Sequence, residues 1–208
     1  MSTSKSLRFK TILEDKVSLL PTQQTRDLEQ HLLDNIKSKM NKRVVKGAAV
    51  LKVIRLINYD YGIIDETNHA GSVNYRVVFE CLVFAPTIHN EITIQIDHTI
   101  KGMYFGDNGV CGILIDINNI DSSVFACIAD NVTHIETQQV LRPGDYVRGY
   151  ILRTGHDKRG IKQLILMCKL LRMATQDEID QFIQDNTADD GDDAVVVDDT
   201  IGSANDFI

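Results

Sequence analysis

The pattern of apolar and polar positions along residues 1–90 predicts strands around a single amphipathic helix. Residues 7–20 mix apolar and polar side chains as a strand does, whereas residues 23–41 carry apolar side chains at helical spacing, every three to four positions. The β-branched stretch 44–64 predicts strands around a turn, and 73–86 alternates as a strand with one buried face. Together these elements predict a small α+β domain over residues 1–90, with the helix covering one sheet face.

The pattern changes in residues 91–173, where short strands follow one another without a strong crossover helix. Isoleucine alternates with polar residues over 92–97, and the dipeptide Asn-Gly at 108–109 separates two apolar runs, which is a strong hairpin signal. After an irregular stretch, two more strands are predicted at 146–153 and 161–171. Five short strands predict a small closed barrel, and the OB-fold is the five-stranded candidate.

Charge separates residues 174–208 from the rest of the chain. The protein has a net charge of -7, yet this last segment holds 11 Asp+Glu and no Lys or Arg, so the preceding part is slightly basic. A short helical pattern surrounds Ile179 and Phe182, and it leads into the acidic run 189–193. We expect the segment to be a disordered acidic tail.

The cysteines, histidines and glycines of the chain do not show the spacing that catalytic, metal-binding or phosphate-binding motifs require. The four cysteines form no Cys-x-x-Cys pair, the six histidines lack ligand spacing, and the chain has no glycine-rich phosphate loop. No apolar run approaches the roughly 20 residues of a membrane span. Reduced free cysteines, no cofactor, no metal, no membrane partner and no catalytic site of its own are therefore expected.

Nucleic-acid binding remains as the candidate chemistry. OB barrels stack bases on exposed aromatic side chains of their second and third strands, and they follow the phosphates with Lys and Arg. Residues of these types in the barrel segment are candidates for contact with RNA: Lys101, Tyr104, Phe105, Arg148, Arg153, Lys158, Arg159 and Lys162. Each has an ordinary alternative, because an aromatic residue can belong to the core and a scattered lysine can simply be solvated. The hairpin tip at 157–160 favours a surface role.

Several short motifs, taken in order, resemble the stalk subunit family of multi-subunit DNA-directed RNA polymerases. That family comprises the seventh subunit of RNA polymerase II, its counterparts in polymerases I and III, and its archaeal equivalent. The resemblance covers residues 7–172, and it rests on Leu19-Leu20-Pro21 before a helix, Gly62, the strand 75–79 leading to Val83-Phe84-Ala85-Pro86, Asn90-Glu91, 102–105 and Gly109.

The resemblance implies a ribonucleoprotein-like N-terminal domain that docks on the polymerase core, followed by an OB-fold domain over 91–173 near the RNA exit path. It implies core subunits, a smaller helical stalk subunit and nascent RNA as partners, and a role in transcription initiation. The docking tip of the family falls on Thr67, Asn68, His69, Ala70, Gly71 and Ser72. Two departures, the linker 86–91 and the acidic extension beyond Met173, fit a viral or otherwise divergent polymerase.

Two other functions remain open at this point. A free-standing OB-fold protein that binds single-stranded RNA in translation or RNA decay would share the barrel and its cationic residues. A nuclease built on the barrel would need a carboxylate cluster that the sequence does not offer. As a cellular polymerase subunit the protein is expected in the nucleus, and as a viral one in the virion or the host cytoplasm.

Overall fold

A computed structural model describes residues 7–41, 43–64, 71–128, 131–156 and 164–190. This part of the chain is mostly β-structure, with a closed five-stranded barrel and two α-helices. The strands are β1 Arg8–Leu19, β2 Val44–Val45, β3 Ala48–Tyr59, β4 Ile63–Ile64, β5 Val73–Phe84, β6 Glu91–Ile100, β7 Met103–Asp107, β8 Gly112–Ile120, β9 Phe125–Ile128, β10 Asn131–His134, β11 Tyr146–His156 and β12 Leu164–Met173. The helices are α1 Leu28–Met40 and α2 Gln176–Asp190, and Pro21–Gln23 forms the short 3-10 helix η1.

The N-terminal half is an antiparallel sheet with one helix on it. Its strands follow the order β1-β5-β3-β2, and β4 pairs with the first residues of β5. Helix α1 buries Leu32, Ile36 and Met40 in a core that includes Val77 and Phe79 of β5. The alternation expected for residues 73–86 is confirmed, because burial along β5 follows the period of two.

Two boundaries in this half differ from the expected ones. The helix begins at Leu28, because Pro21–Gln23 forms η1 and the Gln23 side chain accepts a hydrogen bond from the Leu20 N–H. The first strand expected in the β-branched stretch 44–64 is split near its beginning by a tight turn in which Lys46 and Gly47 take φ of 51° and 85°. Positive φ at two successive residues is the geometry of a two-residue hairpin turn, so β2 and β3 pair with each other.

The second half closes into a barrel with the order β11-β12-β8-β7-β6, and β6 returns to pair with β11. All neighbours are antiparallel except β8 and β12, which are parallel. This connectivity is consistent with the OB-fold. The hairpin expected at 108–109 is confirmed between β7 and β8. Closure needs glycine at Gly106, where a Cβ would lie 2.6 Å from Ile94 Cγ2 and 2.7 Å from the Gln95 carbonyl oxygen.

A small hairpin of β9 and β10 covers one end of the barrel, in the stretch that the sequence left irregular. Phe125 and Val132 of this hairpin are buried in the barrel core, together with Leu141 after it. These strands are only four residues long, too short to show a clear alternation. Their apolar side chains find a core only because the barrel end is open to receive them.

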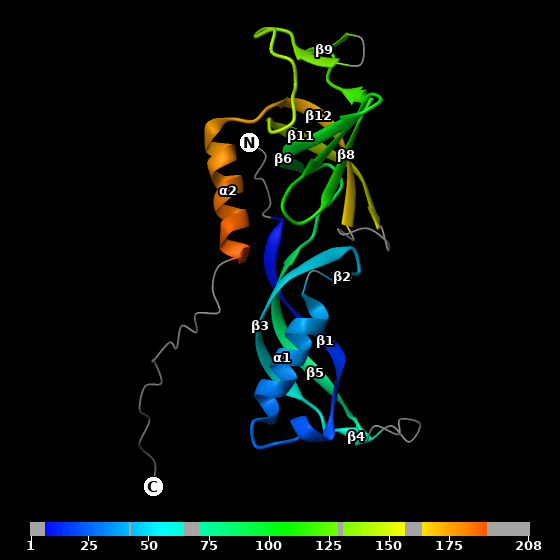
Figure 1. The fold of residues 1–208 in the computed structure, drawn as a ribbon, viewed down its shortest axis with the longest axis vertical. Helices are drawn as coiled ribbons and strands as arrows, with labels where there is room; N and C mark the ends of the chain where they lie inside the picture. Colours follow the sequence, from blue (N-terminus) through cyan, green and yellow to red (C-terminus); the bar gives the residue numbers. More distant parts are fainter. Residues whose placement is uncertain (1–6, 42, 65–70, 129–130, 157–163, 191–208) are drawn as a thin grey trace.

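The other end of the barrel is closed by the N-terminal sheet. Ala49 and Phe84, at the barrel-facing ends of β3 and β5, belong to the barrel core rather than to the core beneath α1. The structure therefore has two apolar cores that meet along an apolar junction. Figure 1 shows the result: an elongated molecule with the barrel at one end and β4 at the other.

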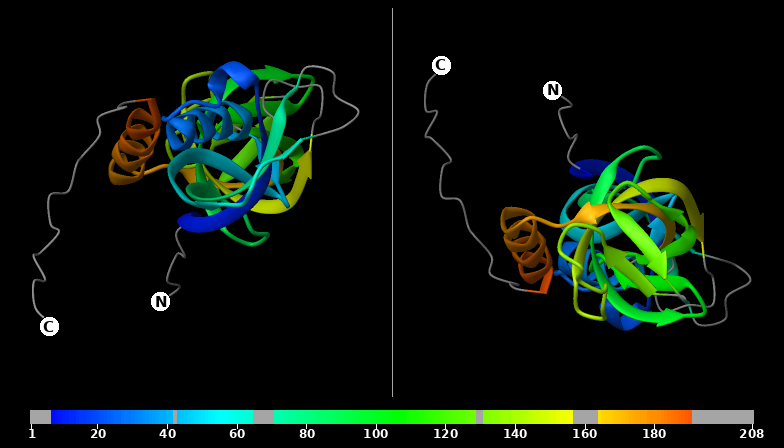
Figure 2. Two further views of the ribbon diagram at one scale, coloured as in Figure 1. Left: turned by 90° about the horizontal axis from the view of Figure 1, so that it is seen from below. Right: turned by 90° about the horizontal axis from the view of Figure 1, so that it is seen from above.

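The expected disorder of the acidic tail is wrong for its first part. Residues Gln176–Asp190 form α2, which lies along the outside of the barrel and reaches down toward β1 (Figures 1 and 2). Residues 191–208 lie outside the described part of the chain. The sequence of α2 carries only a weak apolar stripe, and the ion pairs and the aromatic contact that hold the helix are described below.

Candidate functional sites

The outer face of the barrel carries a row of side chains that the strand register brings together. Phe105 of β7 pairs with His98 of β6 and with Leu114 of β8, and the row continues through Met167 of β12 to Arg153 of β11. We call His98, Phe105, Leu114, Met167 and Arg153 the Phe105 row. The rings of His98 and Phe105 are stacked, with centroids 4.7 Å apart and planes 5° apart. His98 and Arg153 are exposed and Phe105 is half-buried, so the row offers both a ring and a cation.

Lys101 lies at the end of the β6–β7 hairpin, near this row. It takes φ of 48° in the turn, is followed by Gly102 with φ of 77°, and is exposed. The hairpin places Lys101 just beyond the pair Ile100 and Met103, two residue pairs from His98 and Phe105. Proteins that bind single-stranded nucleic acid combine cationic side chains with aromatic rings on which bases stack, and both kinds of residue are present on this part of the surface.

Tyr104, the neighbour of Phe105, points into the barrel. It is 2% exposed, and its hydroxyl oxygen accepts a hydrogen bond of 2.9 Å from the Val132 N–H of β10. The Tyr104 hydroxyl therefore links the β9–β10 hairpin to the barrel, and the buried Tyr104 ring is not accessible for base stacking. Of the two adjacent aromatic candidates, the structure places only Phe105 on the surface.

The end of the molecule farthest from the barrel has a second distinctive surface. Tyr61, Ile63 and Ile64 are 98%, 72% and 66% exposed, and Leu20 is exposed as well. We call Leu20, Tyr61, Ile63 and Ile64 the apolar tip. Exposed contiguous apolar side chains mark interaction sites more often than chance surface.

Of the docking residues expected at 67–72, only Gly71 and Ser72 are described, and they lie at this end of the molecule beside β4. Thr67, Asn68, His69 and Ala70 lie outside the described residues. Gly71 is exposed with φ of 65°, its Cβ position 3.5 Å from Pro21 Cγ, whereas Ser72 is buried. Gly71 therefore lies close to Pro21, the first residue of η1, which follows Leu20 in the chain.

Comparison with curated proteins identifies the family. Over 181 residues, which are 87% of this chain and 90% of the relative, the sequence is 39% identical to a protein of Acanthamoeba polyphaga mimivirus named "Putative DNA-directed RNA polymerase subunit L376". The chain belongs to this family of DNA-directed RNA polymerase subunits. A scan against protein-family models finds no match. The viral origin of the relative agrees with the divergent linker and extension seen in the sequence.

In this polymerase subunit, Arg148 forms ion pairs with acidic side chains and is largely shielded from solvent. Its Nε lies 3.3 Å from Glu91 Oε2 and 3.5 Å from Glu178 Oε1 of α2, its Nη1 donates to Thr93 Oγ1, and the side chain is 17% exposed. Arg172 of β12 donates to both oxygens of Glu178, at 2.7 and 2.9 Å. The hydrogen bonds from Arg172 hold the pKa of Glu178 down at about 2, helped by the Thr175 N–H and by the charge of Arg148.

The eight residues of the polymerase subunit that were expected to contact RNA thus fall into groups with different locations. Lys101, Phe105 and Arg153 share the outer face, Tyr104 is in the core, and Arg148 is held under α2. Lys158, Arg159 and Lys162 lie outside the described residues, in the segment that joins β11 to β12. Sequence reasoning missed His98, although its place in an alternating strand opposite an aromatic residue was a usable signal.

Metal-binding and membrane-spanning features are absent from the described part of the polymerase subunit. Within it, no group of three His, Cys, Asp or Glu side chains is placed to hold a metal ion. Neither of the helices described is long and apolar enough to cross a membrane.

Proposed function

We propose that this chain is a non-catalytic, stalk-type subunit of a DNA-directed RNA polymerase. It docks on the core enzyme through the apolar tip and presents the Phe105 row to emerging RNA, assisting transcription initiation. The observation that carries the proposal is the exposure of three large apolar side chains, Tyr61, Ile63 and Ile64, at the end opposite the barrel.

The apolar tip supports docking on a larger protein. Fully burying one large aliphatic or aromatic side chain contributes roughly 1.5–3 kcal/mol, so covering Tyr61, Ile63 and Ile64 provides several kcal/mol toward association. The expected docking segment 67–72 follows these residues closely in the chain, with only Asp65 and Glu66 between them. A subunit held at this end leaves its barrel projecting from the enzyme, because the molecule is elongated.

The Phe105 row supports contact with single-stranded RNA. Stacking of a base on an aromatic side chain contributes about 1–3 kcal/mol, and His98 and Phe105 already form one stacked pair. Lys101 and Arg153 supply cations for phosphate, and we propose that Lys158, Arg159 and Lys162 add to them from the adjacent segment. With few cations the affinity is weak and falls steeply with salt, which suits a transcript that the polymerase already holds.

The partners follow from this role. We propose association with the core subunits, with a smaller helical stalk subunit where one exists, and with nascent RNA. The ribonucleoprotein-like assignment of the N-terminal half belongs to the same proposal, supported by its strand, helix and strands order. Because the relative is encoded by a virus, we propose the virion or the host cytoplasm as the place of action.

Co-purification tests the docking end. In I63D/I64D two exposed apolar side chains become charged, so the fold survives while the tip loses its apolar surface. We expect a tagged I63D/I64D protein to lose the large polymerase subunits in affinity purification with mass spectrometry. The matched control is I12D, since Ile12 is exposed on β1 away from the tip. Retention of polymerase by I63D/I64D would contradict the proposed docking end.

RNA binding is tested separately, by fluorescence anisotropy with labelled oligouridylate at low salt. F105A is expected to lose about 1–3 kcal/mol of binding free energy, while F9A, which truncates an exposed Phe of β1, leaves it unchanged. Equal effects of F105A and F9A would remove the Phe105 row from the proposal. Wild-type protein that binds RNA but never co-purifies with polymerase would favour the free-standing RNA-binding alternative.

A further inference from the structure

A second cationic and aromatic surface lies beneath α2. Tyr146 and Arg148 are alternate residues of β11, Arg172 stands opposite Arg148 on β12, and Arg8 comes from the start of β1. We call Tyr146, Arg148, Arg172 and Arg8 the covered face. Its barrel residues lie near the start of β11 and the end of β12, whereas Phe105 and Leu114 lie on β7 and β8.

Each residue of the covered face contacts a group of α2. Arg172 and Arg148 bind the Glu178 carboxylate, and Tyr146 meets Phe182 edge to face, with centroids 5.5 Å apart and planes 71° apart.

Arg8 completes this set of contacts. It donates 2.7 Å to the Asp185 carbonyl oxygen and 3.2 Å to Asn186 Oδ1. The helix therefore supplies an anion, a ring and carbonyl acceptors. Single-stranded RNA offers the same three kinds of group in its phosphates and bases.

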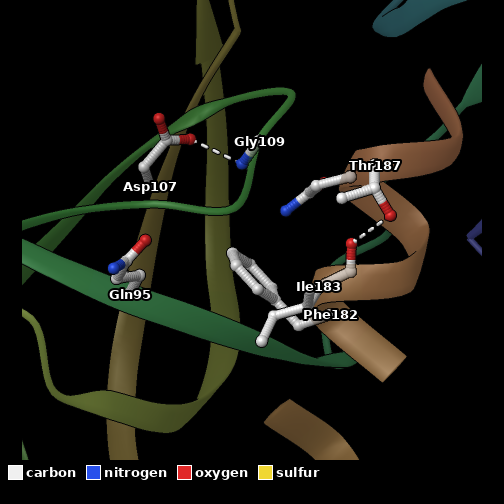
Figure 3. A pocket seen from close by; sticks show the side chains of 7 residues that line it. Gln95, Asp107, Gly109, Phe182, Ile183 and Thr187 are labelled. Carbon is white, nitrogen blue, oxygen red and sulfur yellow. Dashed lines mark hydrogen bonds between the residues drawn. The ribbon is translucent and has the colours of Figure 1, made fainter. Parts of the chain in front are cut away.

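The side chains of α2 are less buried than those of the other main elements of the fold. Along residues 176–187 no side chain of α2 is fully buried. A pocket of about 540 Å³ lies between α2 and the barrel, lined by Gln95, Asp107 and Gly109 on the barrel side. Figure 3 shows Phe182 of α2 pointing toward the barrel beside it. A helix without buried anchors, and with acidic but no basic residues of its own, depends on the arginines beneath it.

The covered face is continuous with the Phe105 row. The outward side of β11 carries Tyr146, Arg148 and Tyr150, and past a bulge it carries Arg153, the last member of that row. A line of cations and rings along one strand follows an extended chain of phosphates and bases. This continuity favours RNA as the occupant over an acidic helix of another protein, which would cover the face without using Arg153.

We propose that α2 is a built-in competitor of RNA, and that the covered face binds single-stranded RNA when the helix lifts. The inference rests on the RNA-contacting role proposed above, and it adds a second contact surface whose access α2 controls. Glu178 stands in for a phosphate, because a guanidinium pairs with carboxylate and phosphate in the same two-pronged way.

Release of the helix in the full-length chain tests the proposal. E178Q/F182A removes the anion and the ring by which α2 is held, and hydrogen exchange of residues 176–187 reports whether it has lifted. We expect E178Q/F182A to bind labelled oligouridylate about tenfold more tightly than wild type at low salt, as one additional net contact would give. Two added phosphate contacts steepen the dependence of log K on log salt by about 1.4.

Control variants separate this effect from others. D177N removes one acidic charge from the same helix at an exposed position, so it should leave RNA affinity close to wild type. Adding R148Q/R172Q to E178Q/F182A should abolish the gain. Adding F105A should lower the affinity of wild type and of E178Q/F182A by the same factor, because Phe105 belongs to the other surface.

The outcomes are distinct. A lifted helix with unchanged RNA affinity overturns the proposal, as does a gain that survives R148Q/R172Q or appears equally in D177N. If E178Q/F182A binds a synthetic peptide of residues 174–190 but no RNA, the covered face accepts the acidic helix alone and the proposal fails. A gain in E178Q/F182A without any effect of F105A supports the covered face and removes the Phe105 row.

Discussion

Removal of the Tyr104 hydroxyl, in Tyr104→Phe, tests whether Tyr104 has a structural role in the barrel core, in contrast to its outward-facing neighbour Phe105. The Tyr104 hydroxyl accepts the Val132 N–H at 2.9 Å, and Val132 is fully buried, so Y104F leaves a buried donor without this acceptor. A buried donor without its partner costs about 1–3 kcal/mol. For a chain of this size, each kcal/mol lowers the melting temperature by about 2–4 °C, which predicts a decrease of roughly 2–12 °C.

Thermal unfolding followed by circular dichroism measures the decrease, and hydrogen exchange at the Val132 amide locates it. Tyr61→Phe is the matched control, because Tyr61 is almost fully exposed and its hydroxyl can be lost without leaving a buried donor. RNA affinity of Y104F should stay at the wild-type value. Equal melting temperatures for Y104F and Y61F, or a loss of RNA affinity in Y104F, would refute the assignment of Tyr104 to the barrel core.

Three further predictions follow from the packing and the charges. The pKa of Glu178 is lowered from 4.5 to about 2 in the folded protein, so its contribution to α2 docking is present above pH 4.5 and is lost as the pH falls toward 2; exchange protection of α2 should follow this course in wild type and not in E178Q. Gly106→Ala should cost about 1–3 kcal/mol in urea unfolding and Gly155→Ala much less, because a Cβ at Gly155 meets nothing closer than 3.7 Å; equal costs would contradict the close approach. Under native conditions N-ethylmaleimide should label exposed Cys127 and spare Cys168, whose burial raises its pKa to about 12. Mass spectrometry after short labelling measures this, and faster labelling of Cys168 than of Cys127 would contradict it.

Alternation along the strands made much of the fold predictable. In β5 the buried positions are apolar, and in β6 Ile92, Ile94 and Ile96 are buried, so the alternation identifies both strands and their inward faces. The Asn-Gly dipeptide located the β7–β8 hairpin for an equally local reason. The β9–β10 hairpin was missed because its four-residue strands are stabilised by the barrel end rather than by a pattern of their own.

The candidate site was less accessible to such reasoning. In β7 the two adjacent aromatic residues, Tyr104 and Phe105, are both apolar, so hydrophobicity could not decide which of them faces the barrel interior. Arg148 looked like a free cation on a barrel strand, since its partner Glu178 is 30 positions away in a segment whose composition favours disorder. A long-range ion pair leaves no periodic trace in the sequence.

The sequence by itself determined the two sheet-built halves, the helix on the first, the hairpin at 108–109 and the acidic character of the C-terminal segment. These features depend on neighbours in the chain, where spacing and turn chemistry act directly. Only the tertiary structure decided that Phe105 rather than Tyr104 faces outward, that His98 stacks on it, and that α2 lies over Arg148 and Arg172. Each of these depends on strand register or on contacts between segments far apart in the chain, where the three-dimensional fold chooses the partner.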